Sequence, residues 1–554
     1  MTNPIFDDRT ISFLLHDCLE VETLCEVPHF EAHSRETIDM YLEAVQKLAR
    51  ERLLPLYRSF DEDEPELENG SVRVHPFMAE LYPQLVELGV LNATRPEEVG
   101  GVQLPWTVYA VSLAYLYGAN LGALAFASLT SGAAHLIEAF GSDALKERYM
   151  AKMYSGEWTG TMALTEPDAG SSLADLTTRA TLASDGSYRL SGTKVYISGG
   201  DQNFTENIVH LTLARIDGAP AGTKGISLFA VPAKRVEADG SLVDNDLITS
   251  GLFHKLGWRG IPSISLTYGE RGDCHGFLVG EEHQGLKYMF QMMNEARIGV
   301  GLAATATASV AYHESLAFAK DRLQGRPLSS PSVGPQIPII QHADVRRMLL
   351  RQKAIVEGAL ALALTTAKFA DLAAYGPDDG RQRAHLLLDL LTPMAKTFPA
   401  ERGFESNALA VQVLGGSGYV NDYMTEAWLR DQKLNSIHEG TSGIQAMDLL
   451  GRKVMKTGGQ SLMALGEEIS GALEAARSAG VDENWCAALE AAVATLTRVT
   501  TQLGTKAMGD AEGMMRNASD YFDLISTLTV GWQWLVMATA AKSGIDSASG
   551  SESD

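Results

Sequence analysis

Apolar residues at helical spacing recur between residues 37 and 140 of the chain. Between residues 37 and 54 they recur on one face of a helix, and residues 77–91 repeat the pattern. Residues 108–140 are rich in Ala, Leu, Gly and Ser, and side chains this small either let helices pack closely or leave space in a pocket. The pattern therefore predicts an N-terminal helical domain.

Near Trp158 the pattern changes from helical spacing to short β-type runs. Turn clusters such as 184–187 (Ser-Asp-Gly-Ser) and Asp217-Gly218 separate the runs. The segments predicted as strands are 188–190, 194–197, 208–214, 226–231 and 264–268. These segments predict a small β-domain.

Helical spacing returns at Glu282 and continues to the end of the chain. Three long segments predict a bundle: 285–323, 344–374 and 383–413. The polar Pro/Gly stretch 325–338 joins the first two, and a Gly-rich linker at 457–459 leads into further helical patterns and a polar tail.

These patterns predict an α+β fold that is mainly α. Its middle β-domain is expected to be barrel-like and to lie between helical domains. The predicted divisions are an N-terminal extension (1–34), an N-terminal helical domain (35–157), the β-domain (158–280), a C-terminal helical bundle (281–455) and an additional C-terminal helical domain (456–554).

Composition narrows the class of protein. The 554 residues are 45% apolar, which is enough for a large core, and the formal charge of −24 argues against nucleic acid or anionic lipid as a main partner. The four cysteines include no CxxC pair, which favours a reducing compartment and no metal site. The acidic run 61–68, broken by Pro65, predicts a solvated loop.

The sequence predicts neither export nor a membrane span. Residues 1–9 are polar and acidic, unlike a signal peptide. The best membrane candidate, 524–541, is uncharged but holds five polar side chains, so a packed helix explains it better. We expect a cytoplasmic protein.

The stretch 437–445 (Ile-His-Glu-Gly-Thr-Ser-Gly-Ile-Gln) concentrates the candidate chemistry. Thr441 or Ser442 can cap the helix that the next residues predict, which leaves Glu439 just outside the helix start. Its turn needs the conformational freedom of Gly440. Taken alone, a carboxylate here also fits a charge that stabilises a helix N-terminus.

Two further stretches change that interpretation. One is 162–172 (Met-Ala-Leu-Thr-Glu-Pro-Asp-Ala-Gly-Ser-Ser), and the other is 412–419 (Gln-Val-Leu-Gly-Gly-Ser-Gly-Tyr), which Leu429-Arg430-Asp431 follows. Together with 437–445 they resemble, in order and at similar spacing, signatures of the flavin-dependent acyl-CoA dehydrogenase family. The resemblance covers roughly residues 75–455 and implies the fold of that family. The extra terminal segments resemble those of a long bacterial subgroup.

The chemistry of such an enzyme needs two acceptors, because two hydrogens leave an unactivated Cα–Cβ bond. No side chain accepts a hydride, so a cofactor must do so. A carboxylate in a dry pocket has a raised pKa and is the stronger base for the α-proton. The resemblance implies that Glu439 is this base, that non-covalent FAD takes the β-hydride, and that the product is the trans-2-enoyl-CoA. It also implies that the Glu439 backbone N–H, beside Gly440, holds the thioester oxygen.

The resemblance further implies contacts to FAD and to the substrate. The Leu164 backbone and the Thr165 hydroxyl would touch the flavin ring, and Ser171 would reach the pyrophosphate and the substrate. Tyr196 stands where the family usually has Trp, and Ser198 where it usually has Thr, so both positions keep their chemical type.

Because the family binds the adenine half of FAD across a subunit interface, the resemblance also implies at least a homodimer. The residues that match its adenosine, pyrophosphate and CoA contacts are Arg322, Gln412, Gly415, Gly416, Thr441 and, for CoA, Arg297. Gln324, Ala343 and Gly443 depart from the family pattern, which affects the adenine contacts. The C-terminal helices would cover the faces that shorter relatives use to form tetramers, which favours a dimer.

Other activities on the same fold stay open at this point. A dehydrogenase would pass electrons to an electron-transferring flavoprotein, whereas an oxidase would pass them to oxygen. A DNA-binding paralogue needs a basic C-terminal region, but residues 452–554 hold 8 Lys/Arg and 13 Asp/Glu. A purely structural protein would not need Glu439. Some relatives place the base directly before the CoA-binding arginine, where this chain has Ala296, and Glu295 points about 100° away on that helix.

Overall fold

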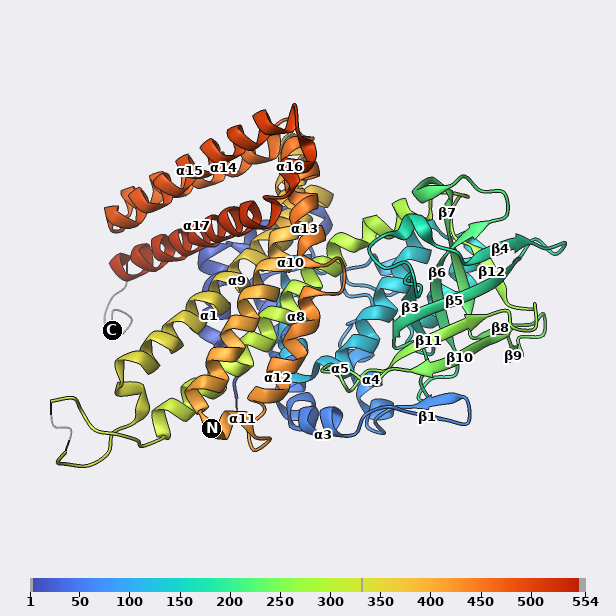
Figure 1. Cartoon of the computed structure of the whole chain (residues 1–554), viewed down its shortest axis with the longest axis horizontal. Coiled ribbons are helices and arrows are strands. Elements are labelled where there is room, and N and C mark those ends of the chain that lie inside the picture. Colours follow the sequence, from blue (N-terminus) through green and yellow to red (C-terminus); the bar gives the residue numbers. More distant parts are fainter. Residues whose placement is uncertain (1–2, 330–331, 548–554) are drawn as a thin grey trace. The chain divides into compact units, whose positions relative to one another are not determined.

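The computed structural model describes residues 3–329 and 332–547, with the backbone alone described at 291–294 and 546–547. It confirms the α+β prediction, because long helices dominate and one large sheet occupies the middle of the sequence (Figure 1). The chain forms two compact units, and each combines separate stretches of sequence. The helical unit comprises Met1–Glu43, Pro105–Gly118 and Arg297–Asp554, and the sheet unit comprises Ala44–Leu104 and Ala119–Ala296.

An eight-stranded sheet forms the centre of the sheet unit. Its order is β10-β11-β5-β12-β7-β6-β3, and β4 pairs with both β5 and β6. The strands are β3 (Thr159–Ala163), β4 (Arg179–Leu182), β5 (Tyr188–Ser198), β6 (Ile208–Ile216), β7 (Ile226–Pro232), β10 (Leu247–Leu252), β11 (Ser263–Tyr268) and β12 (His275–Leu278). Strands β3 and β4 run parallel to β6, and the other pairs are antiparallel. A small separate hairpin joins β8 (Lys234–Val236) to β9 (Leu242–Asp244).

The acidic run 61–68 was predicted to be a solvated loop, and the structure confirms this only in part, because Glu66–Glu68 is exposed but forms a strand. Asp61 is buried at the end of helix α3 (Tyr57–Glu62), and β1 (Glu66–Glu68) pairs with β2 (Ser71–Arg73). Asn69 and Gly70 both have positive φ angles, 52° and 83°, which is the Asn-Gly turn that favours a tight hairpin. Arg73 pairs with two of the glutamates and so offsets the charge of the strand.

Other helical segments complete the sheet unit. They are η4 (Ala49–Leu53), η5 (Leu54–Leu56), α4 (Met78–Glu87), η6 (Glu97–Val99), α6 (Asp143–Leu145), η7 (Lys146–Met150), α7 (Ala151–Tyr154), η8 (Leu173–Asp175) and η9 (Gly222–Gly225). Helix α5 (Trp106–Phe140) belongs to both units, and its backbone departs from helical geometry at Asn120 (φ −160°, ψ 92°). The division between the units, at Gly118 and Ala119, therefore lies beside this kink.

The sequence predicts three long helices, and the structure has them as α8 (Gly285–Asp321), α9 (Ala343–Tyr375) and α10 (Asp378–Leu414). Helices α9 and α10 belong to the helical unit, as does α8 from Arg297 onward. Its other elements are α1 (Asp8–Ser12), η1 (Phe13–Cys18), η2 (Val21–Glu26), η3 (Pro28–Phe30), η10 (Ile339–Gln341), α11 (Gly416–Tyr419), α12 (Thr425–Gln432), η11 (Lys433–Ser436), α13 (Ser442–Asp448) and η12 (Leu449–Met455). Helix α2 (Arg35–Leu48) belongs to this unit up to Glu43. Helix α10 continues through Pro393 and Pro399.

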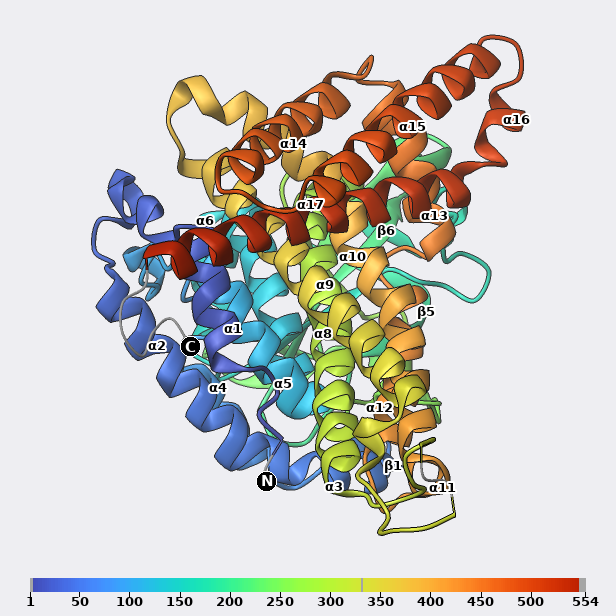
Figure 2. The same ribbon diagram turned by 90° about the vertical axis from the view of Figure 1, so that its left-hand side faces the viewer.

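Additional helices follow the bundle and pack against it. They are α14 (Gln460–Ser478), α15 (Glu483–Ala507), α16 (Ala511–Met515) and α17 (Ala518–Ser547). Helix α17 contacts α9, α10 and α13, and α14 contacts α10 (Figure 2). Buried apolar side chains of both groups form one continuous core, for example Leu390 and Met394 of α10 with Ile525 and Leu528 of α17.

Two described helices are long and apolar enough to pass a simple membrane-span test. The most apolar window of α5 is 100% buried and that of α17 is 50% buried. Buried core helices commonly pass this test, and α5 fits that description. The predicted candidate 524–541 lies within α17.

Candidate active site

Glu439 lies on a tight turn between η11 and α13 in the helical unit. Its φ angle is 51°, and that of Gly440 is 86°, so two consecutive residues are left-handed. A Cβ at position 440 would lie 2.5 Å from the Gln445 Nε2, which explains why glycine is needed there. Thr441 is the N-cap of α13, as one of the two predicted alternatives has it, and its hydroxyl accepts from the Ile444 N–H at 3.3 Å.

Two buried side chains hold the carbonyl groups of this turn. Gln445 donates from Nε2 to the Glu439 carbonyl at 2.9 Å, and Lys396 of α10 donates from Nζ to the Gly440 carbonyl at 2.8 Å. Both side chains are 0% exposed. The turn is therefore anchored from its own helix and from a neighbouring one.

The Glu439 carboxylate itself has no hydrogen bond or ion pair within the described part of the chain. Burial raises the pKa of this carboxyl above its ordinary value, while the cations Arg297 and Lys396 act in the opposite direction. An unpaired carboxylate with a raised pKa can accept a proton, which is the property of a general base.

Arg297 lies in the same unit, within α8, and is 5% exposed. Its Nη1 is 3.5 Å from the Asp448 Oδ2, and Asp448 also pairs with Arg452. The Arg297 Nε is buried without a partner among the described residues. One donor of this guanidinium is therefore uncommitted, although Asp448 orients the side chain.

The segment that follows β3 carries Leu164 and Thr165 in the sheet unit. The Thr165 carbonyl accepts from the Val195 N–H of β5 at 2.9 Å, and Lys194 donates from Nζ to the Leu164 carbonyl at 2.9 Å. Lys194 also pairs with Glu166 at 2.9 Å. The backbone at Leu164 and Thr165 is thus fixed against β5.

Glu166 anchors the rest of this segment from a buried position. Its carboxylate accepts four hydrogen bonds of 2.6–3.0 Å from the backbone and side chains of Thr177 and Thr178, in addition to Lys194. These donors and the Lys194 charge hold the pKa of the Glu166 carboxyl at about 2, against the opposing effect of burial. Ser171, five residues further on, is exposed.

Tyr196 presents an exposed aromatic ring next to this segment. Its side chain is 64% exposed, although its backbone has a φ angle of 60°, which is unusual for an aromatic residue. The ring centroid lies 4.7 Å from that of Phe253. Ser198 ends β5 and is half-buried. Leu164, Thr165 and Tyr196 therefore lie close together through the Val195 hydrogen bond.

Apart from Thr441, which caps α13 beside Glu439, the predicted adenosine and pyrophosphate contacts lie at another place in the helical unit. Arg322 follows the last residue of α8, Gln412 belongs to the last turn of α10, and both are exposed. Gly415 ends α10 with a φ angle of 62°, and Gly416 begins α11. The ring of Phe318 in α8 lies 5.5 Å, between centroids, from that of Tyr423, which follows α11, so the end of α8 is a neighbour of the segment after α11.

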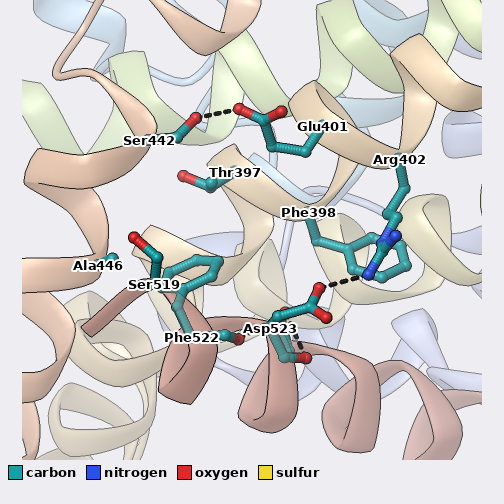
Figure 3. A pocket seen from close by; sticks show the side chains of 10 residues that line it. Thr397, Phe398, Glu401, Arg402, Ser442, Ala446, Ser519, Phe522 and Asp523 are labelled. Carbon is teal, nitrogen blue, oxygen red and sulfur yellow. Dashed lines mark hydrogen bonds and ion pairs between the residues drawn. The ribbon is translucent and has the colours of Figure 1, made fainter. Parts of the chain in front are cut away.

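A cavity of about 270 Å³ lies beside α13, on the side of Ser442 (Figure 3). Its lining residues are Thr397, Phe398, Glu401, Arg402, Ser442, Ala446, Ser519, Phe522, Asp523 and Ser526, from α10, α13 and α17. Ser442 donates to Glu401, and Arg402 pairs with Asp523. Glu439 and the predicted flavin contacts are not among these residues, so the cavity is separate from the base.

Three side chains at these places had no role in the sequence analysis: Lys396, Gln445 and Lys194. The sequence could have indicated Lys396, because it stands alone in the apolar stretch 394–398. A lysine among buried apolar residues is expected to have a specific partner. Gln445 gave no such signal, since its partner is a main-chain carbonyl.

Comparison with known proteins identifies the family. The N-terminal, middle and C-terminal domains of acyl-CoA dehydrogenase match residues 35–157, 161–268 and 283–454, and a domain described as acetyl-CoA dehydrogenase C-terminal like matches 465–554. The chain is 38% identical to 3-methylmercaptopropionyl-CoA dehydrogenase of Ruegeria pomeroyi over 94% of this chain and 90% of that protein.

Solved structures show the same fold. The Caenorhabditis elegans protein ACDH-11, in complex with C11-CoA, superposes with a TM-score of 0.79 at 20% identity, over 97% of this chain and 88% of its own. An acyl-CoA dehydrogenase of Bacillus anthracis complexed with FAD has a TM-score of 0.73 at 22% identity, over 93% and 83% of the two chains.

The chain therefore belongs to the acyl-CoA dehydrogenase family and is an acyl-CoA dehydrogenase. Its identity to the Ruegeria enzyme extends over nearly the whole chain, which confirms the predicted resemblance to the long bacterial subgroup.

Proposed function

We propose that the enzyme removes the α-proton of an acyl-CoA thioester with Glu439 while FAD takes the β-hydride, giving the trans-2-enoyl-CoA. The observation that carries this proposal is the state of Glu439. Its carboxylate is unpaired within the described residues, its pKa is raised by burial, and its turn is anchored by Lys396 and Gln445. A base held in this way keeps its position while it changes charge.

The residues predicted to contact flavin fit such a group. An exposed Tyr196 ring on a left-handed backbone offers an aromatic face, and strain of this kind is typical of ligand sites. The neighbouring Leu164–Thr165 backbone is fixed, and Ser171 offers an exposed hydroxyl. A flavin bound there supplies the hydride acceptor that no side chain can provide. We propose that it is held without a covalent bond.

The polar groups of the chain have separate roles in this proposal. The Glu439 N–H has no acceptor within the described residues, so it is available to the thioester oxygen, where enolate charge develops as the proton leaves. Arg297 has an uncommitted buried donor and is proposed to help position the CoA substrate. Ser171 and Gly440 are proposed to complete the substrate contacts.

A dehydrogenase that passes its electrons to an electron-transferring flavoprotein is favoured over an oxidase. The Ruegeria relative is a dehydrogenase by name, which supports this choice. Hydrogen peroxide measured per turnover tests it, because an oxidase forms one peroxide for each enoyl-CoA. Cytoplasmic location stays a prediction from the sequence.

A direct test uses the purified protein without oxygen. The expected result is a yellow protein whose FAD is released by denaturation and is bleached by an acyl-CoA. A panel of thioesters that includes butyryl-CoA and 3-methylmercaptopropionyl-CoA would rank substrates by kcat/KM. A colourless protein that takes up no added FAD would overturn the proposal.

A further inference from the structure

We propose that Lys396 and Gln445 are positioning residues for the catalytic base: they fix the turn that carries Glu439, and the Lys396 ammonium favours the carboxylate form of Glu439. The inference rests on the proposed role of Glu439. It assigns separable tasks to two buried side chains, one charged and one neutral.

The turn needs external support because its backbone is strained. A left-handed non-glycine residue such as Glu439 persists only where surrounding contacts hold it. Here the two successive carbonyls, of Glu439 and Gly440, each accept a hydrogen bond from a buried side chain at 2.9 Å and 2.8 Å. Removal of either donor would leave a carbonyl of the turn without its hydrogen bond and would free the turn to relax.

Lys396 is well placed to act as a fixed anchor. A Cβ at Gly301 of α8 would lie only 2.0 Å from the Ala395 carbonyl, so the backbones of α8 and α10 approach closely next to Lys396. The lysine is also 0% exposed, which removes the rotamer freedom that surface lysines keep. The position of its Nζ is therefore set by the packing of two long helices.

The charge of Lys396 is not neutralised by an ion pair among the described residues, because its hydrogen bond goes to a neutral carbonyl. Arg297, the other cation that acts on Glu439, is paired with Asp448. Lys396 thus acts on Glu439 as a buried positive charge that forms no ion pair among the described residues.

Further charged and titratable groups face this pair within the helical unit. Glu401 acts on Lys396, Arg452 and Asp389 act on Arg297, and Lys396 acts on His438. Burial lowers the pKa of the His438 imidazole to about 3, so it is neutral at working pH. Burial lowers the pKa of Lys396 to about 8, while Glu439 and Glu401 act in the opposite direction. Lys396 is therefore cationic below about pH 8, where it stabilises ionised Glu439.

The test measures proton removal by itself. Deuterium exchange from D₂O into the α-position of phenylacetyl-CoA needs a base but no hydride acceptor, because its β-carbon bears no hydrogen. The exchange rate is followed by mass spectrometry against pD for wild type, Lys396→Met, Gln445→Met and Glu439→Gln. Butyryl-CoA bleaching of the flavin provides a second pH profile.

The two variants are expected to differ in a defined way. Lys396→Met and Gln445→Met each lose one hydrogen bond to the turn that carries Glu439. The plateau rate of exchange is therefore expected to fall by about 10- to 100-fold, as for a misplaced catalytic group. Only Lys396→Met also loses a cation that lowers the pKa of Glu439, so only its midpoint moves to higher pD. Lys396→Arg retains the charge and is expected to keep the wild-type midpoint.

Lys368→Met is the matched control. Lys368 of α9 also donates to a main-chain carbonyl, that of Leu19, but it is only half-buried and is not among the charges that act on Glu439. Its profile should match wild type. FAD content and thermal unfolding of every variant show whether it has folded.

The outcomes separate the two proposals. If wild type and Glu439→Gln exchange at equal rates, Glu439 is not the base and the proposed function fails. If exchange depends on Glu439 but folded Lys396→Met keeps the wild-type plateau and midpoint, the role of Lys396 is wrong. Equal midpoint shifts in Gln445→Met and Lys396→Met would overturn the assignment of the charge effect to the lysine.

Discussion

At the scale of single residues, Glu439 combines features that are unfavourable for stability. Its left-handed backbone costs on the order of 1–3 kcal/mol. Its side chain is half-buried without an ion pair, and burial raises the pKa of the carboxyl. A base needs this combination, because a well-paired carboxylate such as Glu166, with a pKa of about 2, would bind a proton too weakly.

The first prediction concerns Glu439→Gln. The amide is nearly isosteric and keeps the backbone N–H at 439, so folding, FAD content and acyl-CoA binding should survive. Removal of a general base alone costs about 10²- to 10⁴-fold, and we expect a loss at or above the top of that range. Anaerobic bleaching of the flavin by substrate measures this step.

An enoyl-CoA product serves as the control for binding, since it should still perturb the flavin spectrum of Glu439→Gln. Bleaching within tenfold of wild type would show that another group is the base. Glu295 would be tested next. It pairs with His135 at 3.3 Å in the sheet unit, and this pairing contributes to its lowered pKa.

The sequence predicted the residues of the Glu439 turn, but it did not predict the distant side chains that hold this turn in place. Glu439, Gly440 and the Thr441 cap follow from a local motif, and the structure has the cap as expected. Lys396 is 44 positions away from Gly440 in the sequence, and the two meet only because α10 and the turn pack together. Contacts of this kind depend on tertiary structure, so local patterns do not reveal them.

At the scale of elements, the segment 164–171 depends on β5 for its shape. Lys194 reaches across from β5 to the Leu164 carbonyl and to Glu166, and both ionic side chains are nearly inaccessible to solvent, at 0% and 4%. A buried ion pair is not a reliable source of stability, but removal of one partner is costly. The pair therefore acts mainly to define one conformation of the flavin-contacting segment.

The second prediction is that Lys194→Met weakens FAD binding and destabilises the sheet unit. The change leaves the Glu166 charge buried with hydroxyl and amide donors only, which costs on the order of 3 kcal/mol. Fluorescence of released FAD against added FAD measures affinity, and thermal melts measure stability. Lys234→Met is the control, because Lys234 is more exposed and donates to the Glu206 carbonyl in the same unit. Unchanged FAD affinity in Lys194→Met would contradict the role of the pair.

Predictions of elements succeeded where the pattern was long and regular. The three bundle helices were found to within a few residues, whereas the runs 188–190 and 194–197 are one strand, β5. Ser191-Gly192-Thr193 interrupted the apolar pattern, but pairing with β4 and β11 keeps the strand continuous. Strands β4 and β12 have four residues each, too few for alternation to be visible. The domain limits predicted from sequence stay a prediction.

At the scale of the whole molecule, the C-terminal helices are part of the core of the helical unit. Tyr521, Ile525 and Leu528 of α17 are buried in the same cluster as Leu390 and Met394 of α10. Each fully buried large apolar side chain contributes about 1.5–3 kcal/mol. A region whose side chains complete a shared core is not an independent appendage.

The third prediction follows from that core. A chain that ends at Lys456 should be insoluble or aggregated, because the apolar surfaces of α9, α10 and α13 lose their cover. Soluble yield, size-exclusion chromatography and binding of a hydrophobic dye measure the effect. A chain that ends at residue 547 is the matched control and should behave as wild type. A soluble, FAD-loaded chain ending at Lys456 would contradict the prediction.

The remaining prediction concerns assembly and depends on the spacing of the predicted FAD contacts along the bundle. Lys396, which holds the Glu439 turn, and Gln412 belong to the same helix, and sixteen residues separate them by about 24 Å along its axis. Arg322 and Gly415 lie near the Gln412 end. Arg322, Gln412, Gly415 and Gly416 are thus well separated from the base within one helical unit, whereas Thr441 lies beside Glu439. This is the arrangement expected if each FAD site takes the two groups of residues from two subunits.

Complementation between two inactive variants tests such a shared site. Glu439→Gln lacks the base but keeps Arg322, and Arg322→Ala combined with Gln412→Ala keeps the base but should lose FAD. In a homodimer with sites shared across a twofold interface, a mixed dimer regains one complete site of two, so a randomly exchanged equimolar mixture should recover roughly a quarter of wild-type activity. Light scattering should show a dimer. Sites built within one chain would give no recovery on mixing, and a monomer that retains full FAD would contradict the shared site directly, so the experiment separates the two arrangements without knowledge of the preferred acyl group.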